Sequence, residues 1–489
     1  SISPDQLQGT QPPYLMIKGN RWVIRNCIIL YGLVLYAAPM MYGQTSSPEG
    51  RLPPILMVRG EESYTFLKNN DSTSFLLHKL KWIPLNEKES VALTLGGEYR
   101  ARLEHFTNED YTPTNRTYYA QRMSLHAGLT LGSHFRVFTE LYHGATSDGE
   151  IQFQSDVIDF HQVFLEWSFI NQEKARGKLR LGRQEIGLGT SRLVGIREGP
   201  NMRRTFDMAR LILQVNKASL NLIYGKEVSI NFGAFDNRAF LFDADLVAPS
   251  LWGVYYQRPL FQGMGKLDLY YLGFYAKVSN FNDVIGEEIR HSIGARSFGE
   301  VGNLTYNTEV IVQLGDLAGN QIVAYDLETD WTYQLSSRWW KPRVGLRLDW
   351  SSGDRQQGDG RIGTFNPFFV NPAIYSLAAV NTPANILSFH PNLTLYPCED
   401  LSIFMDYALF YRTQVNDGLY VPPRFLSRPA DGHPERHVGD VLGIQITYEY
   451  SRNITFDVRS SYFIAGRFLE ATGPSENTFY VAPTVSLKF

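Results

Sequence analysis

Positive charge is concentrated between Lys174 and Arg210, in a chain that is slightly acidic as a whole. This stretch holds ten Lys or Arg residues against Glu185, Glu198 and Asp207, whereas the 489-residue chain has a net charge of −3. A guanidinium group stays ionised at any working pH, and its planar fork can meet a carboxylate with two hydrogen bonds. These residue types therefore predict the binding of a solute that carries carboxylates.

The arginine-rich stretch is predicted to be two strands joined by a loop. Leu179 and Leu181 alternate with Lys178 and Arg180, which is the period of a strand, and strand character returns at 207–215. A glycine-punctuated loop at 187–206 lies between the two strands. This loop carries four arginines, which are Arg192, Arg197, Arg203 and Arg204.

The two-residue period recurs along the chain from about residue 91 onward. In 91–103, apolar Leu93 and Leu103 alternate with polar Glu98 and Arg100. Successive side chains of a strand point to opposite faces, so each segment has one apolar face and one wet face. Mean hydropathy is −0.22, which is too polar for a bundle of membrane helices. A barrel that spans lipid has this mixture, and we predict an all-β, antiparallel up-and-down transmembrane β-barrel.

The joints between the strands alternate between short and long. Counting them predicts about 18 strands, an even number as bacterial barrels require, with every long joint on one side. Short periplasmic turns and long extracellular loops are typical of an outer-membrane protein. The long joints are 107–115, 146–156, 187–206, 225–249, 352–385 and 413–440.

The amino-terminal part is predicted to precede the barrel. Lys18, Arg21 and Arg25 come before a short apolar run, 27–41, which indicates a signal peptide at 16–43 after an upstream extension at 1–15. An uncleaved membrane anchor is the alternative. Residues 44–89 are polar and too short for the plug domain of a gated transporter, and the barrel is assigned to 90–489.

The final strand and the aromatic residues support a membrane barrel. An open sheet edge cannot lie in lipid, so the strand ending at Phe489 must pair with the first one. A terminal Phe on such a strand resembles the signal read by the barrel-assembly machinery. Soluble β-propellers and β-sandwiches fit less well, because no repeat of about 40 residues is found and aromatic residues gather near strand ends. The predicted girdle is Tyr142, Trp167, Tyr271, Trp331, Tyr333, Trp350, Tyr411, Tyr448 and Tyr480.

Charged residues on the wet face are predicted to line the lumen and the path of the solute. The arginines are Arg100, Arg102, Arg122, Arg136, Arg180, Arg183, Arg210, Arg343, Arg347, Arg412 and Arg459. The carboxylates are Glu98, Glu140, Glu166, Asp349, Asp406 and Asp457. These wall charges partly cancel, so anion selectivity needs another source. We predict that the loop at 187–206 folds into the lumen and supplies it. Two plainer interpretations are that wall arginines only pair across strands and that loop arginines face lipopolysaccharide phosphates.

Catalysis, metal binding and nucleic-acid binding are not predicted. His126, His134 and His161 are candidates only by residue type, and no Gly-x-Ser-x-Gly motif is present. The acidic stretch around Asp354 and Asp359 lacks the spacing of an EF-hand loop. The sequence therefore favours a protein that is not an enzyme and holds no cofactor.

Three blocks of sequence resemble the alginate-export outer-membrane porin family. The first is Leu181-Gly-Arg-Gln184 with Gly189 and Arg192, followed by Asn201 and Thr205-Phe-Asp207. The others are 352–367 with 390–395, and 407–420. The resemblance implies an 18-stranded monomeric barrel in the bacterial outer membrane that passes an anionic, alginate-like polysaccharide or oligosaccharide. A channel for small carboxylates or other anions, or an outer-membrane enzyme or adhesin that uses the external loops, remain the alternatives.

Overall fold

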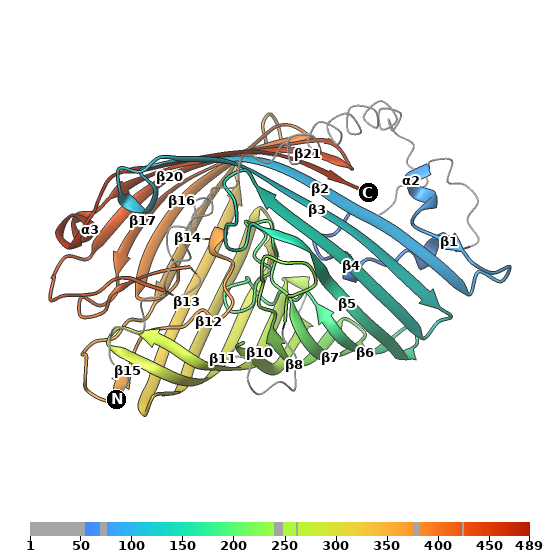
Figure 1. Ribbon diagram of the computed structural model, residues 1–489, viewed down its shortest axis with the longest axis horizontal. Helices are drawn as coiled ribbons and strands as arrows, with labels where there is room; N and C mark the ends of the chain where they lie inside the picture. The colour runs from blue at the N-terminus through green and yellow to red at the C-terminus, as the bar shows by residue number, and fades with distance from the viewer. Residues whose placement is uncertain (1–53, 69–75, 239–247, 261–262, 375–381, 423–424) are drawn as a thin grey trace. The chain divides into compact units, whose positions relative to one another are not determined.

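Most of the chain forms one β-barrel (Figure 1). The computed structural model describes residues 54–68, 76–238, 248–260, 263–374, 382–422 and 425–489. The predicted upstream extension at 1–15 and the predicted signal peptide at 16–43 lie outside the described residues. No helix of the described part is long and apolar enough to cross a membrane.

Eighteen strands of the described chain build the wall, which confirms the number predicted from the sequence. They are β2 (Val91–Thr107), β3 (Arg116–Leu131), β4 (Phe135–Thr146), β5 (Asp156–Asn171), β6 (Ala175–Gln184), β7 (Phe206–Val215), β8 (Ala218–Glu227), β9 (Ser250–Pro259), β10 (Lys266–Phe281), β11 (Val284–Val301), β12 (Leu304–Leu317), β13 (Asn320–Gln334), β14 (Arg343–Ser351), β16 (Ile386–Cys398), β17 (Leu401–Arg412), β20 (His437–Ser451), β21 (Ile454–Ala465) and β22 (Thr478–Lys488).

Each of these strands pairs antiparallel with the next, and the last pairs with the first. The pairing of β22 with β2 places Leu487 opposite Tyr99 and Thr484 opposite Arg102. Phe489 continues the seam, since its backbone N–H donates to Gly97 O at 3.0 Å and its carbonyl accepts from Gly97 N at 3.1 Å. The barrel is therefore closed, as lipid requires.

The remaining elements are short. They are η2 (Arg59–Glu61), η3 (Thr65–Leu67), α2 (Leu76–Lys79), β1 (Ile83–Pro84), η4 (Glu109–Tyr111), β15 (Arg361–Ile362), η6 (Pro372–Ile374), β18 (Leu419–Val421), β19 (Phe425–Arg428) and α3 (Arg467–Thr472). β1 pairs with the start of β2, and β15 pairs parallel to β13. β18 and β19 form a separate two-stranded sheet.

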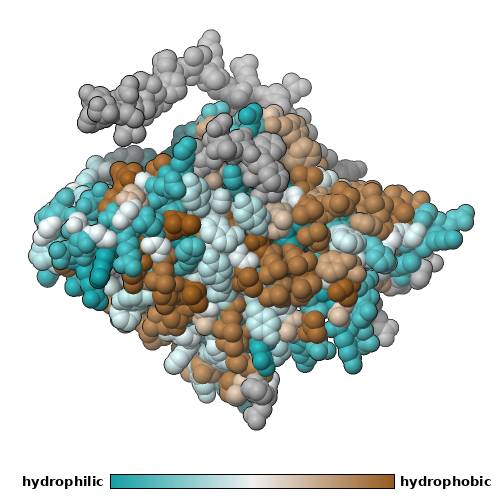
Figure 2. All heavy atoms as spheres, turned by 90° about the horizontal axis from the view of Figure 1, so that it is seen from below, coloured by the Kyte–Doolittle hydropathy of each residue, from teal (hydrophilic) through white to brown (hydrophobic). Residues whose placement is uncertain are grey.

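The alternation read from the sequence separates the two faces of the wall. In β2, Glu98, Arg100 and Arg102 are buried, whereas Leu103 is 46% exposed. In β11, Arg290 is buried and Ile293 is 60% exposed. Figure 2 shows apolar side chains gathered across the middle of one face, with polar side chains toward both ends. An apolar outer band with a polar interior is the arrangement of a barrel in lipid.

The aromatic girdle is only partly as predicted. Trp167, Trp331 and Tyr448 are exposed on the outer face. Tyr142 and Tyr480 are instead 1% and 5% exposed and point into the barrel, because they share strand parity with the buried Glu140 and Ala482. Tyr480 does lie near a strand end, whereas Tyr142 lies well inside β4, and neither side chain is on the outer face.

The six long joints lie at the same end of the barrel, as predicted, but two other connections at that end are tight. β10 and β11 are joined by residues 282–283, and β12 and β13 by residues 318–319. Ala318 and Gly319 have φ of 49° and 85°. Two positive φ values in a two-residue turn match the right-handed twist of the strands it joins.

Loops and an amino-terminal segment occupy the interior of the barrel. Aromatic residues of the β14–β16 loop, Phe365, Phe368 and Phe369, are buried against wall residues such as Phe206 and Phe274. Residues 54–68 also enter. The Arg59 guanidinium donates to the Phe489 carbonyl at 2.5 Å, and Arg136 of β4 donates to Gly60 O at 2.7 Å. This segment is shorter than a plug domain, yet it reaches the lumen wall.

Candidate functional site

The β6–β7 loop, residues 185–205, lies inside the barrel as the sequence predicted. Arg192 is 1% exposed and forms ion pairs with three wall carboxylates. Its Nη2 lies 2.7 Å from Glu328 and 2.5 Å from Asp349, and its Nε lies 3.4 Å from Asp326. β13 and β14 place these carboxylates on one inward face, so Arg192 fixes the loop to the far side of the wall.

A second cluster surrounds Glu198 of the same loop. Arg122 of β3 lies 2.6 Å from Glu198 and 2.5 Å from Glu98, and Arg100 of β2 lies 3.5 Å from Glu198. Arg100 also donates to the carbonyls of Glu198 and Pro200 at 2.9 and 2.8 Å. Burial would raise the pKa of Glu198, but Arg122, Arg203 and Arg100 outweigh it and hold that pKa well below its ordinary value. The wall arginines of β2 and β3 thus hold the loop in place.

The remaining two paired loop arginines join the loop to other segments. Arg203 lies 2.7 Å from Glu185 and 3.1 Å from Glu198, and it donates to Met57 O of the amino-terminal segment at 2.9 Å. Arg204 lies 2.8 Å from Glu227 and donates to the carbonyl of Phe369. The β6–β7 and β14–β16 loops also pair through their backbones, with Gly195 N donating to Phe369 O at 2.9 Å.

Arg197 differs from its three neighbours. Its side chain is 6% exposed, and no carboxylate of the described residues lies within ion-pair distance of it. Its guanidinium lies over the Phe153 ring, 3.9 Å from the centroid, and donates to Met202 O at 3.3 Å. Burial, followed by the nearby Arg204, lowers the pKa of Arg197 to about 9 against the opposing effect of Glu227. A buried cation that no carboxylate of the described chain contacts is a candidate for binding an anion that comes from outside.

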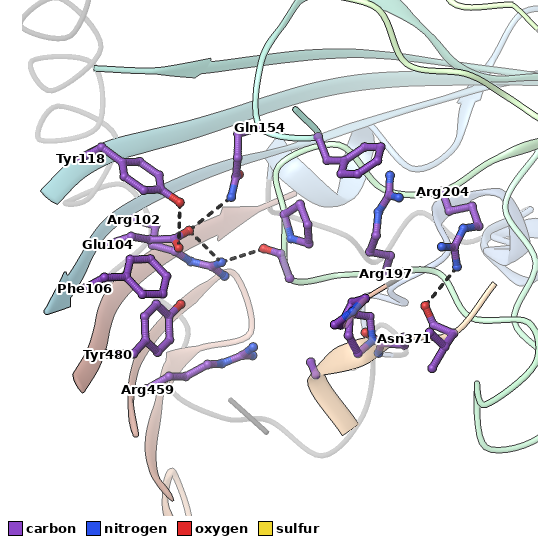
Figure 3. Close-up of a pocket in the computed structure, with 17 residues that line it drawn as sticks. Arg102, Glu104, Phe106, Tyr118, Gln154, Arg197, Arg204, Asn371, Arg459 and Tyr480 are labelled. Carbon is purple, nitrogen blue, oxygen red and sulfur yellow. Dashed lines mark hydrogen bonds and ion pairs between the residues drawn. The ribbon is translucent and has the colours of Figure 1, made fainter. Parts of the chain in front are cut away.

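A cavity of about 260 Å³ lies beside Arg197 (Figure 3). Tyr118, Phe106 and Tyr480 project into it from β3, β2 and β22, and the loop supplies Arg197 and Arg204 from the other side. Four arginines in total line the cavity, which are Arg102, Arg197, Arg204 and Arg459. Glu104 is the carboxylate among the lining residues, and it is occupied by Tyr118 at 3.0 Å and Arg102 at 3.5 Å. The cavity therefore combines aromatic surface with an excess of positive charge.

The other predicted wall arginines all have protein partners. Arg102 donates to Gly199 O at 2.6 Å, Arg347 lies 3.7 Å from Asp330, and Arg459 lies 2.9 Å from Asp457. Arg412 donates to the carbonyls of Val415, Asp417, His433 and Glu435 and so organises the β17–β20 loop. Arg343 lies over the Tyr396 ring. Among these five, Arg347 pairs across neighbouring strands as the plainer interpretation predicts. Arg102 and Arg412 instead bind carbonyls of loops inside the barrel.

Arg183, Glu140 and Asp406 do not take part in the arginine–carboxylate pairs of the lumen wall. Arg183 stands on the face opposite to Arg180 and bonds to Asp207 at 2.9 Å, so it does not join the lumen arginines. Glu140 accepts from Gln162 at 2.7 Å, and Asp406 lies 3.8 Å from His390. Glu98, Glu166, Asp349 and Asp457 do pair with arginines, as expected.

Several residues of the site were not predicted from the sequence. Glu185 and Glu198 are acidic residues of a basic stretch. Their place among arginines was the one signal in the sequence that they would pair with arginines of the same stretch, as both do with Arg203. Asp326 and Glu328 share the strand parity of Asp349 across β13 and β14, but their partner comes from a loop. Glu61 lies in a segment with no strand pattern, so no local signal marked it.

A closed 18-strand barrel with an apolar outer face and a charged lumen is the architecture of an outer-membrane channel. The alginate export family matches residues 91–482, and the chain belongs to that family. It is therefore a channel of the bacterial outer membrane and not an enzyme, in agreement with the sequence-based expectation. A comparison with curated proteins found no match.

Solved structures of outer-membrane proteins from Pseudomonas aeruginosa share the fold. The structure of OccK2 (OpdF) in complex with glucuronate is 12% identical, with a TM-score of 0.54 over 81% of this chain and 98% of that one. OpdO is also 12% identical, with a TM-score of 0.55 over 81% and 97% of the two chains. OccK5 (OpdH) is 14% identical, with a TM-score of 0.52 over 81% and 98%.

Proposed function

We propose that this channel passes an anionic, alginate-like polysaccharide or oligosaccharide. The observation that carries the proposal is Arg197, a buried guanidinium beside an aromatic cavity with no carboxylate partner among the described residues. A uronic acid residue offers a carboxylate to the guanidinium and the apolar face of its ring to Tyr118 or Tyr480. Transport requires several weak contacts rather than one tight site, and Arg102, Arg204 and Arg459 line the same cavity as Arg197.

Small carboxylates are the second candidate. The cavity volume of about 260 Å³ is just below the roughly 300 Å³ at which ligand pockets begin, so it fits one sugar residue or one small acid. OccK2, which shares the fold, was solved with glucuronate. Block of the current by a uronate oligomer at lower concentration than by glucuronate supports the polymer, because linked residues bind through several sites at once. Equal blocking concentrations per carboxylate support the small acid.

Replacing Arg197 by glutamine is expected to weaken anion binding in the lumen. Hydrogen bonds to charged groups contribute about 1.5–3 kcal/mol, so the concentration of oligouronate that halves the single-channel current should rise at least tenfold. The reversal potential in a KCl gradient should also shift toward lower anion preference. Planar-bilayer recording measures both quantities.

Arg338→Gln is the matched control, because Arg338 is exposed in the turn between β13 and β14 and its loss removes the same charge from outside the lumen. An unchanged blocking concentration and reversal potential in Arg197→Gln would contradict the role of Arg197. A parent channel with no preference for anions would contradict the proposed function as a whole.

A further inference from the structure

A row of charged residues crosses the lumen wall on neighbouring strands. Arg136 of β4 stands opposite Glu166 of β5, Glu166 opposite Arg180 of β6, and Arg180 opposite Arg210 of β7. Three arginines therefore share the row with one carboxylate. Glu166 is already occupied by Arg180 at 2.6 Å and by Lys178 at 2.9 Å.

The pairing of Arg180 with Arg210 is unfavourable by itself. Like charges directly opposite each other on adjacent strands destabilise a sheet, and here both lie on the inward face. An anion between them removes the repulsion. The structure contains such an anion, since Oε1 of Glu61 lies 2.8 Å from Arg180 and 3.0 Å from Arg210. Burial alone would raise the pKa of Glu61, but Arg180 and Arg210 outweigh it and lower that pKa to about 2.

The contacts that hold residues 54–68 in the lumen are mostly polar. Besides Glu61, the segment is held by Arg136 on Gly60 O, Arg203 on Met57 O and Arg59 on Phe489 O. Its apolar contacts are few, because the small cluster there comprises Tyr64 and Leu67 packed against Trp82. Met57 and Phe66 remain about half exposed, at 51% and 52%. Glu61 is the one charged side chain among these contacts that pairs with the wall, so the pairs with Arg180 and Arg210 are the contacts for which another anion can compete.

We propose that Arg180 and Arg210 form a binding site for a carboxylate of the transported solute, and that Glu61 fills this site in the solute-free channel. Residues 54–68 then act as a plug that the solute displaces. The Glu61 side chain is 37% exposed, so a carboxylate arriving through the lumen can reach it. The inference rests on the proposed function for the identity of the solute, but not for the existence of the plug.

Glu61→Gln keeps the size of the side chain and removes the charge that bridges the two arginines. In planar bilayers with KCl, this variant is expected to show at least a twofold rise in mean conductance over the parent. In the parent, sodium glucuronate must displace Glu61 before it reaches Arg180 and Arg210. In Glu61→Gln the arginine pair is vacant, so glucuronate should lower the current at a lower concentration than in the parent. Glucose, which lacks the carboxylate, should block neither channel.

Two further variants separate the plug from general effects of charge and folding. Glu87→Gln is the matched control, because Glu87 is an exposed acidic residue of the same amino-terminal part. Arg210→Gln removes the partner from the wall side and leaves the Arg180–Glu166 pair in place. It should raise conductance as Glu61→Gln does, and the double variant should add little to either. Heat-modifiable migration in gel electrophoresis confirms that each variant is folded.

The outcomes for the plug and for the proposed function are distinguishable. Parent-like conductance in folded Glu61→Gln and Arg210→Gln overturns the plug, even when the channel prefers anions. Higher conductance in both variants, together with no anion preference and no response to glucuronate, leaves the plug standing and overturns the carboxylate site and the proposed function.

Discussion

Arg192→Met is expected to release the β6–β7 loop from the wall of the barrel. Asp326, Glu328 and Asp349 would lose their shared cation while remaining almost fully buried. Removing one partner of a buried ion pair typically costs about 3–5 kcal/mol, and three carboxylates depend on this one. The variant should unfold at lower urea concentration, and limited proteolysis should cut the loop.

The matched control is Arg176→Met, the same substitution at an exposed position of β6, which should change neither property. Adding Glu328→Gln and Asp349→Asn to Arg192→Met should recover part of the lost stability, because fewer uncompensated charges then remain. Unfolding and cleavage identical to the parent in Arg192→Met would show that the loop is held by other contacts.

Ile293→Arg is expected to destabilise the barrel through its outer face. Ile293 is 60% exposed at the middle of β11, where the outward side chain meets the lipid core. Arginine at the midplane of a membrane barrel costs about 2–4 kcal/mol, and the cost falls to about 0–1 kcal/mol near the interfaces. Reversible denaturant unfolding in phospholipid bilayers measures this difference.

Val301→Arg serves as the control at the end of the same strand. Val301 is 50% exposed and has the outward parity of Ile293, but it lies at the periplasmic end. Equal costs at the two positions would mean that the apolar band does not lie in the membrane. A much larger loss of stability for Ile293→Arg than for Val301→Arg would place Ile293 deeper in the lipid than Val301.

The sequence was sufficient for the wall because the alternation of side chains is a local property. The strand count, the inward positions of Arg100 and Arg122, and the side of the long loops all follow from it. The alternation of short and long joints did not predict the tight turn formed by Ala318 and Gly319, which lies at the end of the barrel that carries the long loops. Tyr480 lies near a strand end, as predicted, but its side chain faces the interior and cannot belong to a girdle on the outer face.

The partners of the charged residues could not be predicted, because they come from distant segments. Arg192 and Asp349 are separated by 157 residues, and no periodicity relates a loop to the strand it reaches. The same limit applies to Glu61, whose position depends on how residues 54–68 cross the interior. Composition indicated an excess of positive charge in the loop, but only the three-dimensional pairing singles out Arg197.

The contact between Arg59 and the carbonyl of Phe489 has a consequence for the order of biogenesis. That carbonyl is held in place as an acceptor only when β22 has paired with β2, because Gly97 of β2 binds the backbone of Phe489. Arg59, although it is among the first described residues to be synthesised, therefore reaches its resting place only after the closing strand has been inserted.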